Sequence, residues 1–361
     1  MKRRGFLKAG GLAVAATTFA RPAIARAAPE IRWRLVSSFP GGLDIIFGSA
    51  QRFARYVSEA TDGRFTIEPH PAGAIVPAFG ALDAVADGRV ECAQTPTYFY
   101  ADRDPTLAFG TGIPFGLNAR HQHAWWQVGG GGEIVNEVLH RFGVHAIVMG
   151  NSGTQMGGWF RKEIGSVDDL RGLKFRIGGM GGQILARLGV EPQQMPPNEV
   201  LSALERGALD AAEFVGPYDD EKLGFHRVAK HYYCPGWWEG GAMLHLLVNH
   251  EKWQELPNGY KSILQQAGEA TTNWMLARYD VENPAALRRL ESAGVTVKAF
   301  PTPVIEACWR AAKQHYAELS ANNASFRKAL ESHDTFQADA LSYWRIAEHP
   351  YDSMMLRLLE S

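Results

Sequence analysis

Cysteine is scarce in this sequence. The 361 residues include only three, Cys92, Cys234 and Cys308. Three widely spaced cysteines cannot build a disulfide framework or a CxxC metal site, and an odd number leaves at least one thiol free. The sequence therefore excludes a small disulfide-stabilised fold.

Long apolar runs and a basic surface are also missing. After the first 20 residues, no segment is long and apolar enough to cross a bilayer core, which takes about 20 residues. Lys and Arg number 37 against 38 Asp and Glu, a formal net charge of −1. This balance argues against nucleic acid and anionic lipid as partners, and we expect no direct membrane insertion.

The N-terminus has the features of an export signal. It reads MKRRGFLKAGGLAVAATTFARPAIARA, an arginine pair followed by an apolar run and then small residues at alternate positions. This order is typical of a twin-arginine signal peptide, with A-x-A cleavage sites ending at Ala25 and Ala27. The apolar run, residues 9–20, is too short for a membrane anchor. We expect residues 1–27 to be removed on export to the periplasm.

The remaining chain has an α/β pattern. Its length of about 335 residues exceeds what one hydrophobic core usually serves, so two lobes are expected. Residues 31–39 alternate in polarity like a strand, residues 45–63 place apolar side chains on one helix face and end in glycine, and residues 64–70 resume a strand. This β-α-β order predicts α/β layers with a mostly parallel sheet.

Two later segments share one pattern. In ALDAVADGRVECAQ, residues 81–94, and LSALERGALDAAEF, residues 201–214, a short helix is closed by a glycine within the frame G-x-[VL]-[DE]-x-A. Common helix-to-strand turn chemistry produces such a match by chance. A true repeat would place one copy in each lobe, with a ligand between the lobes at the carboxyl ends of the strands.

Four polar residues amid aromatic side chains are the candidate site: Gln155 in NSGTQMGGWF, Arg176 at the end of KFRI, Glu213 in AAEFVGPY and Glu239 in GWWEGG. The planar guanidinium of Arg176 suits a carboxylate, although an arginine exposed at the surface fits the spacing equally well. Glu239 in so aromatic a setting needs a partner, which could be an arginine, a metal ion or a sugar hydroxyl. Amide and carboxylate oxygens suit a hard cation such as Na⁺ or Ca²⁺. Alternatively, the two glutamates are separate structural salt-bridge partners.

The other motifs do not indicate catalysis or nucleotide binding. GGMGG, residues 178–182, lacks the last glycine of a dinucleotide fingerprint, and the glycine run 129–132 lacks the end of a phosphate loop and is expected to start a helix. His121 and His123 have no third metal ligand at a recognisable spacing. The acidic run DDEK, residues 219–222, is typical of the solvated start of a helix.

The sequence resembles the extracytoplasmic solute receptors of TRAP transporters, the DctP-like family, and most of all the branch that binds small 2-oxo acids, including pyruvate. The resemblance covers nearly the whole chain and rests on WRLVSSFP, ATDGRF, NSGTQMGGWFR, LKFRIGG, FVGPYDDEKLGF and YCPGWWEGG. It implies an α/β, two-lobed periplasmic-binding-protein fold with hinge strands, long bracing helices and a helical C-terminal extension. The implied boundaries are 28–151 plus 242–283 for lobe I, 152–241 plus 284–310 for lobe II, and 311–361 for a dimerisation extension.

The resemblance also implies roles for the candidate residues. Arg176 would hold the ligand carboxylate, and the bound cation, Na⁺ or alternatively Ca²⁺, would be shared by Gln155, Glu213, Phe214 and Glu239. Phe214 departs from the tryptophan of the branch and leaves more space for a ligand. The expected substrate-binding set is Gln155, Arg176, Phe214, Glu239, Tyr98, Tyr100, Trp237 and Trp238.

We therefore expect a periplasmic solute-binding protein, not an enzyme, that delivers a small 2-oxo monocarboxylate to the TRAP permease subunits. The alternatives are an exported cation-dependent enzyme acting on a small organic acid, a receptor for a 2-hydroxy acid such as lactate, and a sugar-binding module. An enzyme would need a group whose pKa matches proton transfer, and the sequence offers no convincing base.

The C-terminal extension predicts a homodimer. Its apolar residues need a covering surface, because a large apolar patch rarely stays exposed. They are Tyr316, Leu319, Phe326, Leu330, Phe336, Leu341, Trp344, Ile346, Met354, Met355 and Leu358. Packing back onto the same chain would cover them equally well.

Overall fold

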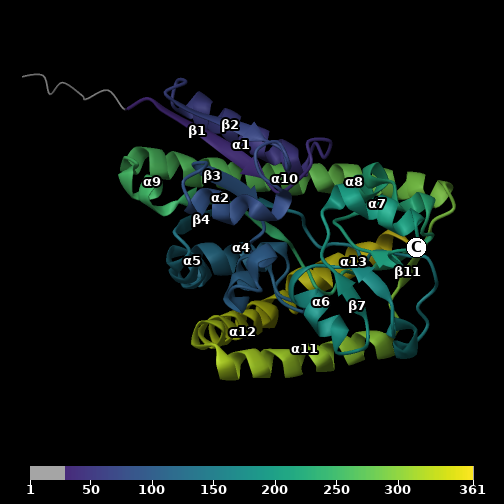
Figure 1. The fold of residues 1–361 in the computed structure, drawn as a ribbon. Helices are drawn as coiled ribbons and strands as arrows, with labels where there is room; N and C mark the ends of the chain where they lie inside the picture. Colours follow the sequence, from purple (N-terminus) through teal and green to yellow (C-terminus); the bar gives the residue numbers. More distant parts are fainter. Residues whose placement is uncertain (1–28, 361) are drawn as a thin grey trace, which may run out of the picture.

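The structure, a computed structural model, describes residues 29–360. It consists of two lobes side by side, each built on a mixed sheet and covered by helices (Figure 1). The predicted signal peptide, residues 1–27, lies outside the described residues. Within residues 29–360, no helix combines the length and the apolar character that crossing a membrane requires.

The first sheet has the strand order β2-β1-β3-β10-β4. Its strands are β1 (Ile31–Ser37), β2 (Phe65–His70), β3 (Cys92–Thr95), β4 (Val144–Asn151) and β10 (Met243–Asn249). Helix α1 (Ile46–Ala60) connects β1 to β2, and α2 (Ala81–Ala86) precedes β3. Strand β1 pairs in parallel with β2 and β3, as the β-α-β pattern predicts, whereas β10 runs antiparallel to β3 and β4.

The second sheet has the order β11-β9-β5-β8-β6-β7. Its strands are β5 (Trp159–Phe160), β6 (Lys174–Arg176), β7 (Glu191–Gln193), β8 (Ala211–Ala212), β9 (His231–Cys234) and β11 (Thr296–Ala299). Helices α6 (Gly179–Ala186), α7 (Pro197–Glu205) and α8 (Pro217–Leu223) follow β6, β7 and β8. Strand β6 is parallel to β7 and β8, and β5 is antiparallel to β8 and β9.

The two sheets share one topology. In each, a β-α-β-α-β run supplies three parallel strands, and the antiparallel fourth strand, β10 or β5, follows directly after the chain arrives from the other lobe. Gly88 and Gly207 of the shared sequence frame lie just before β3 and β8 with φ of 69° and 72°. Glycine adopts this backbone region freely. The shared frame therefore marks equivalent turns in two equivalent sheets.

Two adjacent segments carry the chain between the lobes before β10, residues 152–158 after β4 and residues 235–242 after β9. They run side by side, because the amide of Gln155 donates to the carbonyl of Glu239 at 3.2 Å and the amide of Gly236 donates to the carbonyl of Gln155 at 2.8 Å. The residue boundaries of the lobes stay a prediction.

Long helices connect the lobes. Helix α10 (Asn258–Ser292), 35 residues long, packs on α1 and β4 of the first lobe and on α8 of the second. Helices α3 (Ala108–Thr111), α4 (Ala119–Val128), α5 (Gly131–Arg141) and α9 (His250–Glu255) complete the first lobe. The glycine run at 129–132 does start a helix, because α5 begins at Gly131.

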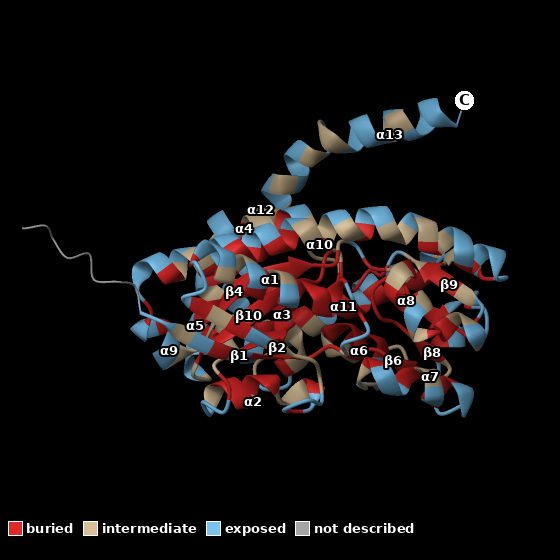
Figure 2. Ribbon diagram, turned by 90° about the horizontal axis from the view of Figure 1, so that it is seen from above, coloured by how far each residue is buried: buried red, intermediate tan, exposed pale blue. Residues whose placement is uncertain are grey.

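The C-terminal helices divide into a packed part and a free part. Helix α11 (Thr302–Asn322) packs on α6, and α12 (Ala324–Trp344) packs on α4 and α5, with Tyr316 and Phe326 buried. Helix α13 (Glu348–Leu359) has no buried residue and extends away from the body (Figure 2). The extension therefore covers part of its apolar surface within the same chain.

Candidate functional site

A small cavity lies between the lobes. Its wall draws on the carboxyl ends of strands in both sheets and on both crossing segments, as a ligand site between two α/β lobes requires. The lining residues that bear on function are Phe39 after β1, Tyr98 after β3, Arg176 at the end of β6, Phe214 after β8, and Gln155 and Glu239 in the crossing segments.

Arg176 is held firmly at the end of its strand. Its Nε donates to the carbonyl of Met195 at 3.1 Å, and its Nη1 donates to both the carbonyl and Oε1 of Glu213 at 2.6 Å. Both side chains are only 3% exposed, so this is a buried ion pair. Within residues 29–360 its Nη2 makes no hydrogen bond, which leaves a donor at the cavity wall.

Two buried carboxyl groups lie near Arg176: Glu239 lines the cavity, whereas Glu213 pairs with Arg176 and is not among the residues that line it. Burial raises the pKa of Glu213 to about 7, although Arg176 opposes the rise, and Asp220 adds to it. Burial raises the pKa of Glu239 well above its ordinary value, and the neighbouring Glu213 raises it further, against the effect of Arg176. The side chain of Glu239 accepts no hydrogen bond within the described chain. An ionised Glu239 therefore needs a positive partner that the cavity would have to admit.

Gln155 presents a free acceptor beside this pair. Its Nε2 donates to Oγ of Ser152 at 3.2 Å, whereas its Oε1 is buried without a hydrogen-bond partner. Buried polar atoms of this kind are rare and call for an explanation. The amide oxygen of Gln155 and the carboxylate of Glu239, both at the cavity wall, are donors of the kind that a hard cation prefers.

The candidate cation ligands include only two ionisable side chains, Glu213 and Glu239. Among residues 29–360, no group of three or more His, Cys, Asp or Glu is arranged to hold a metal ion. A cation here would use two carboxylates, an amide oxygen and backbone carbonyls, which is the chemistry that Na⁺ and Ca²⁺ accept and that zinc does not favour.

Three of the expected aromatic residues do not line the cavity. Tyr100 is buried in the first lobe, where its hydroxyl accepts from the amide of Leu82 at 3.2 Å. Trp237 stacks on Phe115 with ring centroids 4.7 Å apart, and Trp238 packs edge-on against Phe175. Of the aromatic residues named from the sequence, the structure brings Tyr98 and Phe214 to the cavity.

The acidic run at the start of α8 is not solvated, although it does start a helix. Asp219 and Asp220 are buried, at 0% and 1% exposure. Asp220 accepts hydrogen bonds from Nε1 of Trp159 at 2.9 Å, the hydroxyl of Tyr232 at 2.8 Å and the amide of Val215 at 3.2 Å. It thereby fixes the segment after β8 that carries Phe214. The sequence did not reveal this role, because acids at a helix start are usually exposed.

Sequence reasoning also missed several apolar lining residues. Phe39, Phe99 and Met275 line the cavity from the end of β1, the turn after β3 and helix α10. Only Phe39 carried a usable signal, since it lies at the carboxyl end of the strand predicted over residues 31–39.

Comparison with known proteins gives one consistent family. The sequence profile of the bacterial extracellular solute-binding proteins of family 7, DctP, matches residues 36–323. A curated relative, the monocarboxylate 2-oxoacid-binding periplasmic protein of Nostoc sp. (strain PCC 7120), is 41% identical over 359 residues, 98% of each chain.

Solved structures match the whole fold. A TRAP transporter solute-binding protein from Bordetella bronchiseptica is 44% identical, with a TM-score of 0.91 over 92% of this chain and 99% of its own. It is described as a mixed-occupancy dimer with calcium and picolinate at one active site. A TRAP periplasmic solute-binding protein from Pseudoalteromonas atlantica, with bound sodium and pyruvate, is 36% identical, with a TM-score of 0.87 over 90% of this chain and 99% of its own. These matches confirm the predicted two-lobed α/β fold.

Proposed function

The chain belongs to family 7 of the bacterial extracellular solute-binding proteins, the TRAP transporter receptors, and on that premise we propose that it captures a small 2-oxo monocarboxylate such as pyruvate. The family consists of transport receptors rather than enzymes, so the predicted class of protein is confirmed. The 2-oxo acid is the ligand class in the name of the Nostoc relative, and pyruvate is bound in the Pseudoalteromonas structure.

The observation that carries the proposal is the charge arrangement at the cavity. Two buried glutamates, Glu213 and Glu239, face one arginine. A carboxylate ligand cannot approach two such groups unaided, because like charges repel strongly in a partly desolvated cleft. A bound cation would supply the missing positive charge and a second contact for the ligand oxygens.

Each residue at the cavity would have its own role in binding the ligand or the cation. The free Nη2 of Arg176 donates to the ligand carboxylate, and Glu213 holds the guanidinium in place from behind. Gln155 and Glu239, on the two crossing segments, hold the cation, with Glu213 and the backbone of residue 214 completing the set. The rings of Tyr98 and Phe214 limit the length of the ligand.

Calorimetry tests the ligand and the cation together. The protein is unfolded, dialysed, refolded and titrated with pyruvate, lactate and succinate, in Na⁺, in Ca²⁺ and in neither. We expect pyruvate to bind most tightly and only when a cation is present. Glu239→Gln should weaken both partners, whereas Glu163→Gln, an exposed glutamate paired with Lys298, should change neither.

Other results would reverse the proposal. Tighter binding of lactate would identify a 2-hydroxy-acid receptor, and full-affinity binding of pyruvate by Glu239→Gln without a detectable cation would return Glu239 to a structural role. Chemical conversion of the acid during incubation, followed by mass, would support the cation-dependent enzyme.

Location and assembly complete the proposal. The family is extracytoplasmic, and we propose a periplasmic location reached by the twin-arginine route, with delivery to the permease subunits.

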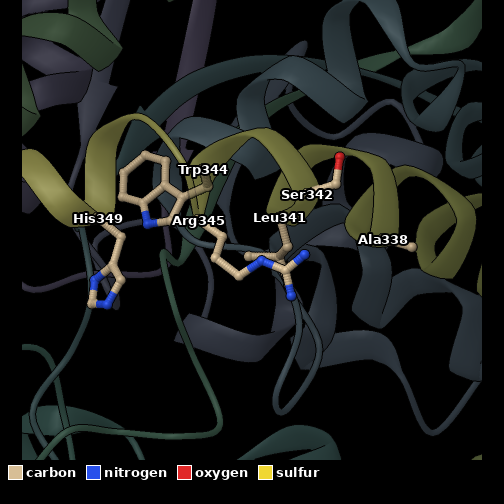
Figure 3. Close-up of a pocket in the computed structure, with 6 residues that line it drawn as sticks. All are labelled: Ala338, Leu341, Ser342, Trp344, Arg345 and His349. Atoms are coloured by element: carbon tan, nitrogen blue, oxygen red, sulfur yellow. The ribbon is translucent and has the colours of Figure 1, made fainter.

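We also propose a homodimer, because α13 exposes Leu356, Leu358 and Leu359 to solvent. Trp344 and Leu341 border a hollow at the junction of α12 and α13, which a second copy would cover (Figure 3). The dimeric Bordetella relative supports this assembly.

A further inference from the structure

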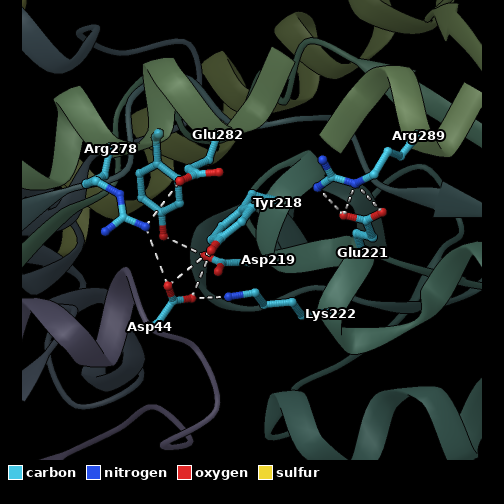
Figure 4. A network of polar contacts seen from close by, with 9 residues as sticks. Asp44, Tyr218, Asp219, Glu221, Lys222, Arg278, Glu282 and Arg289 are labelled. Carbon is cyan, nitrogen blue, oxygen red and sulfur yellow. Dashed lines mark hydrogen bonds and ion pairs between the residues drawn. The ribbon is translucent and has the colours of Figure 1, made fainter. Parts of the chain in front are cut away.

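A polar cluster outside the cavity joins the two lobes. Asp44 lies in the loop between β1 and α1 of the first lobe, and its carboxylate faces helix α8 of the second (Figure 4). The hydroxyl of Tyr218 donates to Oδ2 and Oδ1 of Asp44 at 3.0 and 3.2 Å. The ammonium of Lys222 makes an ion pair with Oδ1 of the same group. Arg278 of α10 approaches Oδ2 at 3.5 Å.

The cluster is arranged around the charge of Asp44. Partial burial opposes ionisation of Asp44, but the hydrogen bonds from Lys222 and Tyr218 and the charge of Lys222 outweigh it, so its pKa lies below the ordinary value. The ammonium of Lys222 also stands 4.0 Å from the ring centroid of Tyr218. Asp44 therefore gathers three donors from two elements.

Helix α8 is fastened to α10 independently of Asp44. Glu221 forms an ion pair with Arg289 at 2.6 Å, and the amide of Tyr218 donates to Oδ1 of Asn283 at 3.0 Å. Tyr279 donates from its hydroxyl to Oδ2 of Asp219 at 2.6 Å. These contacts hold α8 on α10 without the participation of Asp44. The contact of Asp44 with α8 is different, because it joins two segments on opposite sides of the cleft.

We propose that Asp44 is a latch residue, which stabilises the closed arrangement of the lobes through Tyr218 and Lys222 and so slows the release of ligand without touching it. Separation of the two lobes must break these contacts. A receptor whose closed state is stabilised binds its ligand more tightly, because less of the binding free energy is spent on closing. Asp44 and Lys222 are half and two-thirds buried, so the gain is that of a partly screened pair.

The latch is tested with Asp44→Asn and with Glu221→Gln as the matched control. Both changes remove one carboxylate that pairs with a cation at α8 or α10, but only the first crosses the cleft. One measurement is the distance distribution between spin labels on the two lobes, with and without pyruvate and Na⁺. The other is the dissociation rate of pyruvate. We expect Asp44→Asn to shift the distribution toward longer distances and to speed dissociation about two- to tenfold.

A charge-swapped pair of variants distinguishes loss of the latch from loss of folding. Asp44→Lys should open the lobes, and adding Lys222→Asp should restore both the distance and the dissociation rate in part. Unchanged distances together with an unchanged dissociation rate in Asp44→Asn would overturn the latch, as would an equal effect of Glu221→Gln.

The ligand readout rests on the proposed function, whereas the distance readout does not. If pyruvate fails to bind the wild-type protein, the proposed ligand is wrong, and the distances between the labels alone decide the latch.

Discussion

At the scale of single residues, the decisive pair is Arg176 with Glu213. The two side chains are buried together as an ion pair. The backbone carbonyls of Met195 and Glu213 also accept hydrogen bonds from the guanidinium. Breaking a buried pair by removing one partner is far more destabilising than losing an exposed one, because an uncompensated charge stays behind. Arg176 therefore has one fixed orientation before any ligand arrives.

Arg176→Ala should abolish ligand binding. The ligand carboxylate loses its donor, and the unpaired Glu213 adds a second negative group, so we expect pyruvate affinity to fall by more than 100-fold, about 3 kcal/mol. Titration calorimetry measures this, and circular dichroism checks that the variant is folded. Arg187→Ala, which removes an arginine that pairs with Glu318, is the control. Binding of pyruvate within threefold of wild type would contradict the assigned role.

The chemistry of these residues made them candidates from the sequence, but the sequence did not show which of them lie close together. Arg176, Gln155, Glu213 and Glu239 stood out because polar groups amid aromatic residues need partners. Trp237 was expected to line the ligand site because the resemblance implied it, yet its ring stacks on Phe115 and does not line the cavity. An aromatic ring finds its partner through the packing of the whole lobe, which a local pattern does not contain.

At the scale of elements, helix α8 has an unusual beginning. Asp219 lies in its first turn, wholly buried, with one oxygen accepting from Tyr279 and the other, Oδ1, without a partner. Burial raises the pKa of Asp219 to about 7, although the hydrogen bond from Tyr279 opposes the rise. The start of α8 was predictable from the acidic run. The burial of Asp219 was not, because it depends on α10, which packs against α8.

Asp219→Asn should change how stability depends on pH. Between the ordinary pKa near 4 and the raised value near 7, folded Asp219 keeps a proton that the unfolded chain has released. The free energy of unfolding therefore falls as pH rises through this range. Asparagine removes that penalty, so we expect the variant to be more stable than wild type at pH 8, by about 1 to 4 kcal/mol, and equal to it below pH 4.

Urea unfolding at a series of pH values measures this effect. Asp168→Asn, at an exposed position, should follow the wild-type curve. A constant difference between Asp219→Asn and wild type at every pH would show that ionisation of Asp219 is not involved.

The start of α6 is a second element whose sequence is constrained. Gly179 has φ of 57°, and a Cβ there would stand 2.5 Å from Cδ2 of Tyr98, which comes from the other lobe. Gly179→Ala should therefore keep the cleft from closing and weaken pyruvate binding about tenfold or more, measured by calorimetry. Gly259→Ala, where nothing lies within 4 Å, is the control. Normal affinity in Gly179→Ala would mean that Tyr98 moves aside freely.

At the scale of the whole molecule, the sequence predicted more of the architecture than of the assembly. Strand periodicity located β1 and β2, and the frame around Gly88 and Gly207 located the same turn in each sheet. The fate of the C-terminal apolar residues was open, since packing on the same chain or on a second copy satisfies the same pattern. The structure assigns Tyr316 and Phe326 to the chain's own core and leaves α13 exposed.

Removal of α13 should separate the proposed dimer. A chain ending after Arg345 loses the exposed residues of α13 but keeps the packed part of α12. We expect light scattering to give the monomer mass for this variant and the dimer mass for the full chain. Pyruvate affinity should be preserved, because none of the expected binding residues lies in α13. A dimer without α13 would place the interface elsewhere.

The double crossing of the chain also has a consequence for synthesis on the ribosome. Strand β10 lies between β3 and β4, yet residues 159–234, with five strands of the other sheet, emerge before it. A nascent chain that ends before residue 243 holds β4 with no neighbour to pair with. The first sheet therefore stays incomplete while five strands of the second sheet are made, and it closes only when Met243–Asn249 leave the exit tunnel.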